Sequence, residues 1–175
     1  MDETTPYETL TKLEAAERQL RVAIRLFFER RDLVAVHTLA AAAQGVLRDL
    51  GRSRGFKSIF EGSELIRPEC RKDLDRLFNR AQNFFKHADR DADAQLQFYY
   101  EATKFHLFDA ALLYNQLTGR QFPEITGLIA WFSLNFPHLL VEGLFKREIE
   151  ALKRQGANSD DLQLFLDLID QYTKK

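Results

Sequence analysis

The sequence has few of the residues that interrupt helices and few that form cross-links. Eight Gly and four Pro occur among 175 residues, which is about 7% of the chain against a usual content near 12%, so a turn-rich β-sandwich or barrel is not expected. The single cysteine, Cys70, excludes an internal disulfide and a cysteine-based zinc site, and so predicts a reducing compartment. These absences favour an all-α protein.

An excess of charge of one sign is also lacking. Twenty-five Lys and Arg balance 26 Asp and Glu to a net charge of -1, so the chain as a whole is not built to coat nucleic acid or anionic lipid. No apolar run approaches about 18 residues, and Met1 is followed by acidic and polar residues rather than a basic and apolar leader. We therefore expect a cytoplasmic protein without membrane contact, in which any nucleic-acid binding depends on a local patch.

Apolar residues repeat at three- and four-residue spacing, which predicts a single bundle of six to eight helices over residues 1–175. Two helices are expected to meet at Arg31-Asp32, with Asp32 as an N-cap and Gly51 as the C-terminal cap of the second. A connection over 51–67 is expected to hold only a short helix near 56–60. Longer helices are predicted over about 68–87 and 94–118. Three shorter ones follow, around Trp131, through Leu140 to Leu152, and over 160–172.

The helix predicted over 68–87 has a polar side turned away from its apolar side. The polar stripe consists of Arg76, Arg80, Asn83, His87 and Arg90. A histidine titrates near neutrality and an arginine keeps its charge, so such a pair can cleave RNA without a metal. His87 would be the general base or acid, Arg80 would stabilise the phosphorane, and Asn83 could orient either.

Further basic residues offer contacts to a phosphate backbone or to a protein partner. Arg76 and Arg90 belong to the polar stripe, and Arg52, Arg54 and Lys57 lie in the connection after the second helix. Because the net charge is balanced, any nucleic-acid binding needs a local basic patch, and clusters of this kind can supply one. The sequence contains no glycine-rich phosphate loop and no Gly-x-Ser-x-Gly elbow.

The run LFNRAQNFFKHADRD, preceded by AVHTLAAAAQGVLRDL, resembles the HEPN superfamily, whose helical bundles carry an Arg, four to six residues and a His on one helix. The resemblance covers about residues 10–120. It implies an HEPN-like core over 1–120 and a C-terminal helical extension over 121–175 packed on that core. Catalytic members are typically metal-independent endoribonucleases, often toxins or defence factors, that pair two such helices across a dimer. By resemblance Arg80 and His87 would be the catalytic pair, with Asn83 as helper and no cofactor.

Two functions remain open at this point. Many HEPN proteins are non-catalytic, so the polar stripe could instead belong to a binding or accessory module that contacts a protein or a nucleic acid without cleaving it. The alternative is the ribonuclease itself. A homodimer is expected in either case, because Phe98, Phe105 and Leu112 form a second apolar stripe on the helix predicted over 94–118.

The remaining candidates have simpler interpretations. His37 shares a stripe with Gln44 and Arg48 and could serve as a ligand, but a histidine in an Ala-rich helix is more often buried and hydrogen bonded. His106 and Asp109 lie three residues apart, yet no second Glu-x-x-His pair accompanies them, so no metal is expected. The 15 Phe and 5 Tyr fall mostly at core spacing and are expected to pack rather than to stack on bases.

Overall fold

The computed structural model describes residues 6–61, 80–85, 92–140 and 145–173. Within these ranges the elements are α1 (Lys12–Phe28), α2 (Leu33–Arg52), the 3-10 helix η1 (Ile59–Glu61), α4 (Glu101–Thr118), α5 (Pro123–Asn135), α6 (Lys146–Arg154) and α7 (Leu162–Thr173). Residues 80–84 are also helical. The described ranges contain no strand, and the predicted all-α bundle of six to eight helices is confirmed.

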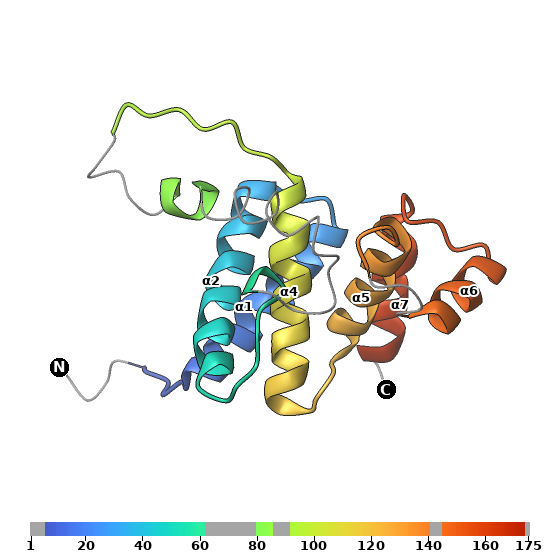
Figure 1. Ribbon diagram of the computed structural model, residues 1–175, viewed down its shortest axis with the longest axis horizontal. Coiled ribbons are helices and arrows are strands. Elements are labelled where there is room, and N and C mark those ends of the chain that lie inside the picture. The colour runs from blue at the N-terminus through green and yellow to red at the C-terminus, as the bar shows by residue number, and fades with distance from the viewer. Residues whose placement is uncertain (1–5, 62–79, 86–91, 141–144, 174–175) are drawn as a thin grey trace.

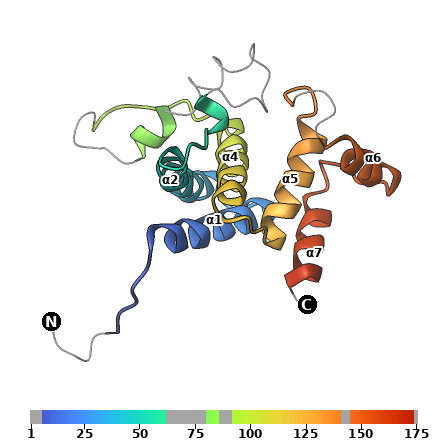
Figure 2. The ribbon, with the colours of Figure 1, turned by 60° about the horizontal axis from the view of Figure 1, so that its bottom comes forward.

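Helices α1, α2 and α4 pack together, and the C-terminal helices lie beside them (Figure 1). Figure 2 shows α5 and α7 side by side, with α6 at the outer edge. The rings of Phe108 and Phe132 stack between α4 and α5 with their centroids 3.8 Å apart. No helix in the described part of the chain combines the length and the apolar character needed to cross a membrane.

The start of α2 follows the sequence signal, but its end does not. Asp32 caps the helix as predicted, because its Oδ1 accepts hydrogen bonds from the amides of Val34 (3.0 Å) and Ala35 (3.1 Å). The prediction that Gly51 is the terminal cap is wrong, since α2 continues to Arg52 and is capped by Ser53. Gly51 instead permits close packing, because a Cβ there would lie 3.3 Å from a methyl group of Leu113.

The predicted boundaries of two later helices are also corrected. Helix α4 begins at Glu101 rather than near residue 94, and the residues just before Tyr100 are not helical. In this conformation Phe98 places its ring 5.2 Å from that of His37 on α2. Helix α6 begins at Lys146, so Leu140 does not belong to it as predicted, although Ile149 and Leu152 do.

The apolar stripe that suggested a second chain is covered in part by this chain. Phe98 is not helical, so the predicted stripe does not exist as one helix face. Phe105 is buried, and its ring lies 5.3 Å from those of Phe132 and Phe136. The homodimer stays a prediction, without the support that this stripe was expected to supply.

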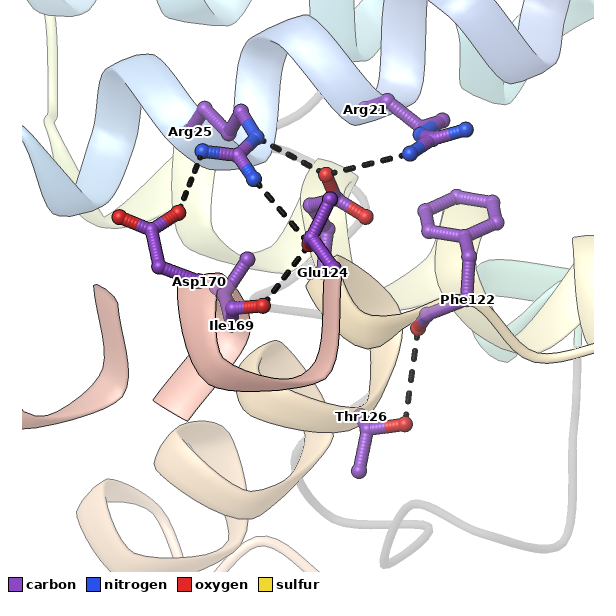
Figure 3. Close-up of polar contacts among 8 residues, drawn as sticks. Arg21, Arg25, Phe122, Glu124, Thr126, Ile169 and Asp170 are labelled. Carbon is purple, nitrogen blue, oxygen red and sulfur yellow. Dashed lines mark hydrogen bonds and ion pairs between the residues drawn. The ribbon is translucent and has the colours of Figure 1, made fainter. Parts of the chain in front are cut away.

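Ion pairs connect α1 to both α5 and α7 (Figure 3). Arg25 donates from Nε to Oε1 of Glu124 and from Nη1 to Oδ1 of Asp170, each at 2.9 Å. Arg21 lies 3.5 Å from the same Glu124 oxygen. Glu124 is only 1% exposed, so these two guanidinium groups compensate a buried charge.

Replacing Arg25 with methionine is expected to lower the free energy of unfolding by about 2 kcal/mol, as measured by urea denaturation. Breaking a buried ion pair typically costs roughly 3–5 kcal/mol, and here Arg21 still reaches Glu124. The double variant Arg25→Met, Glu124→Gln removes the uncompensated charge and should be more stable than the sum of the single losses predicts. Additive losses would contradict a coupled pair.

Candidate functional site

The inner side of the segment 80–85 is anchored on α2. Ala81 is buried, and the Nε2 of Gln82 donates to the carbonyl oxygen of Ala41 at 3.5 Å. Phe85 makes a T-shaped contact with His37, with the ring centroids 5.6 Å apart. These contacts fix the orientation of the segment relative to the bundle, so its opposite side faces the solvent.

Arg80 and Asn83 are exposed on this segment. Residues three apart in a helix lie on one side, so the guanidinium and the amide are presented together. The predicted orientation, with Ala81 inward and Arg80 and Asn83 outward, agrees with the structure. The other members of the polar stripe, Arg76, His87 and Arg90, lie outside the described residues.

The predicted basic contacts of the connection after α2 form a separate group. Arg52, Arg54 and Lys57 are exposed, but Arg52 pairs with Asp49 at 3.6 Å and also with Glu61. Arg54 donates to the carbonyl oxygen of Leu117 at 3.1 Å. Arg52 also lies roughly 16 Å along the helix axis from Ala41, where the segment 80–85 is anchored. Arg52 and Arg54 already have partners within the chain.

A buried polar contact joins α2 and α4 beneath the segment 80–85. His37 is fully buried, and its Nδ1 lies 3.1 Å from the hydroxyl oxygen of Thr103. The ring of His106 lies 4.9 Å from the ring of His37. Burial lowers the pKa of His37 from 6.5 to about 4, so the side chain is neutral near pH 7. The buried, hydrogen-bonded interpretation of His37 is therefore confirmed.

Asp109 is the centre of a second buried cluster on α4, six residues beyond Thr103 and three beyond His106. Its Oδ2 accepts hydrogen bonds from Gln44 and from the Ser58 hydroxyl, each at 2.7 Å, and its Oδ1 accepts one from the Ile59 amide at 2.8 Å. Burial raises the pKa of Asp109, and the three hydrogen bonds oppose that effect. Both oxygens thus hold the connection after α2 against α4. The described residues contain no group of three His, Cys, Asp or Glu side chains placed to hold a metal.

The structure adds two exposed aromatic side chains, although most of the aromatic residues were expected to pack. Tyr99 is 55% exposed and Tyr100 is 60% exposed, immediately before α4. Their exposure was not predicted, because the sequence analysis began the helix near residue 94 and so treated residues 94–99 as helical, which they are not. A helix start placed at Glu101 would have revealed them.

The resemblance to the HEPN superfamily stays a prediction. Arg80 and Asn83 are exposed, as a site on this helix requires, whereas His87 lies outside the described residues. The fully buried His37 cannot reach a substrate at the surface. Comparison of the chain with protein-family models, curated proteins and solved structures gave no match.

Proposed function

We propose that the chain is a binding module that contacts RNA through the exposed side chains of Arg80 and Asn83. The observation that supports this proposal is that the two sides of the segment 80–85 differ. Gln82 and Phe85 contact α2, whereas Arg80 and Asn83 are exposed to solvent. A guanidinium is a permanent, forked donor that suits phosphate oxygens, and an amide can donate to a phosphate or to a base edge. Arg80 makes no ion pair within the described ranges, so it is available for such a contact.

The charge balance of the chain favours a small contact over a broad electrostatic surface. The net charge is -1, and Arg52 is already paired with Asp49 and Glu61. Binding should therefore involve few phosphates, and its affinity should fall only moderately as salt increases. Such a module would recognise RNA without cleaving it.

Arg80→Ala is expected to weaken binding of a fluorescein-labelled, single-stranded RNA by about tenfold, which corresponds to about 1.4 kcal/mol. The loss of one phosphate contact should also reduce the slope of log affinity against log salt by about 0.7. Fluorescence anisotropy at several salt concentrations measures both effects. Arg120→Ala, which removes an exposed arginine just beyond the C-terminal end of α4, is the matched control and should bind like the wild type. Equal affinities of the two variants would contradict the proposal.

The second candidate function is the metal-independent endoribonuclease that the HEPN resemblance implies. The exposure of Arg80 and Asn83 on one side of a helix favours it, since the sequence pattern predicts His87 on the same side as these two residues. Incubating the same RNA with the protein and EDTA separates the two functions. RNA that is bound and stays intact supports the binding module, whereas cleavage that His87→Ala abolishes identifies the ribonuclease.

A further inference from the structure

Two adjacent tyrosines are exposed where the chain enters α4. Tyr99 and Tyr100 are 55% and 60% exposed, and both precede the first residue of the helix, Glu101. The hydroxyl of Tyr99 lies 3.4 Å from Oε1 of Gln97. Large aromatic side chains normally gain stability by burial, so two neighbouring exposed rings indicate a surface that contacts another molecule.

These tyrosines are joined to the segment that presents Arg80 and Asn83. Phe98 makes a T-shaped contact with Phe85 at 5.2 Å between ring centroids, and another with Tyr100 at 5.5 Å. Phe85 belongs to the same segment as Arg80 and Asn83. Figure 1 shows residues 92–100 passing over this segment before they enter α4. Aromatic contacts therefore connect Tyr100, through Phe98, to Phe85 on the inner side of the segment whose outer side carries Arg80 and Asn83.

We propose that Tyr99 and Tyr100 stack on unpaired bases of the RNA whose phosphate Arg80 contacts, which makes the ligand single-stranded. This inference rests on the proposed function and specifies its ligand. Tyrosine faces stack on bases with little dependence on sequence, whereas the faces of bases within a duplex are already covered by their neighbours. Arg80 supplies the backbone contact that stacking alone lacks.

The charges beside the tyrosines are compatible with an anionic ligand. Glu101 follows Tyr100 directly, but its Oε1 accepts a hydrogen bond from Nζ of Lys104 at 2.7 Å. That pair offsets the carboxylate that follows Tyr100 in the sequence. Phe98 is half-buried against His37 and Phe85, so the backbone that carries the tyrosines is anchored to the bundle and less entropy is lost when they bind.

The double variant Tyr99→Ala, Tyr100→Ala is expected to weaken binding of a single-stranded RNA by about 10- to 100-fold, because stacking contributes about 1–3 kcal/mol per base. The double variant Tyr99→Phe, Tyr100→Phe keeps the ring faces and should bind like the wild type. Tyr172→Ala removes a tyrosine that is also 60% exposed, on α7, and should bind like the wild type. The slope of log affinity against log salt concentration should be the same for the double alanine variant as for the wild type, because no phosphate contact is lost.

The RNA probe is varied as well as the protein. A single-stranded RNA with abasic sites should bind the wild-type protein weakly, with an affinity similar to that of the intact strand for the double alanine variant. A duplex of the same sequence should also bind the wild-type protein weakly. If wild type binds the single strand through Arg80 but the double alanine variant binds equally well, the stacking inference is wrong and the proposed function stands. If wild type binds none of the RNA probes, the proposed function itself is wrong.

Discussion

Replacing Asp109 with leucine is expected to lower the free energy of unfolding by about 4 kcal/mol, because three buried donors lose their acceptor at once. These donors are the Gln44 amide, the Ser58 hydroxyl and the Ile59 backbone amide. Leucine has the same branching as aspartate but no acceptor and a larger volume, so the loss comes from unsatisfied polar groups and some overpacking rather than from a cavity. Urea denaturation at pH 7 gives the magnitude.

The matched controls for Asp109→Leu separate burial from hydrogen bonding. On α7, Gln163 Nε2 donates to Oδ1 of Asp167 at 2.7 Å, the same distance as between Gln44 and Asp109, but at an exposed position. Asp167→Leu should therefore cost less than about 0.5 kcal/mol. Asp109→Asn retains one carbonyl oxygen and should fall between the two. The backbone amide of Ile59 should also exchange faster with solvent in Asp109→Leu, and unchanged exchange would contradict the assigned contact.

Local signals in the sequence predict the start of α2 and the orientation of the segment 80–85. Asp32 caps the amides that follow it, and this contact spans only a few residues. Likewise, the helical repeat alone predicts that Ala81 lies on the buried side and that Arg80, about 100° away around the helix axis, lies outside it. Such features need no knowledge of what packs against the helix, so the pattern of the sequence is sufficient.

Contacts between distant residues account for what the sequence pattern did not predict. Helix α4 starts only at Glu101, and the non-helical Phe98 before it packs between His37 and Phe85. His37 and Phe85 belong to two other parts of the chain. The hydrogen bond from Ser58 to Asp109 depends on how the connection after α2 lies against α4. Periodicity within one helix contains no information about its register against another helix. The exposure of Tyr99 and Tyr100, just before the observed start of α4, was likewise not predicted.

The contacts of His37 are expected to make the bundle sensitive to acid. The ring is fully buried, Nδ1 is bonded to Thr103, and Nε2 has no hydrogen-bond partner within the described residues. The rings of His106, Phe85 and Phe98 surround it. None of these described contacts is a carboxylate that could stabilise an imidazolium, so protonation of His37 in the folded state is unfavourable.

The free energy of unfolding should therefore fall by about 3 kcal/mol through His37 alone as the pH decreases from 6.5 to 4. The unfolded histidine binds a proton near pH 6.5, whereas the folded one binds it only at a pKa of about 4. The stabilising contribution is thus complete above pH 6.5 and is lost as the pH falls through this window. Asp109, whose pKa burial raises, acts in the opposite direction, because it is protonated more readily in the folded state.

Comparison with His37→Asn isolates the histidine from other titrating groups. Asparagine can keep a hydrogen bond to Thr103 but loses the ring contacts, so the variant should be less stable at pH 7. Because it does not titrate, its stability should approach that of the wild type as the pH decreases to 4. Val36→Ala, which removes buried methyl groups from the same helix, should instead give a stability curve parallel to that of the wild type. If the His37→Asn curve is also parallel, the buried histidine is not the source of the acid sensitivity.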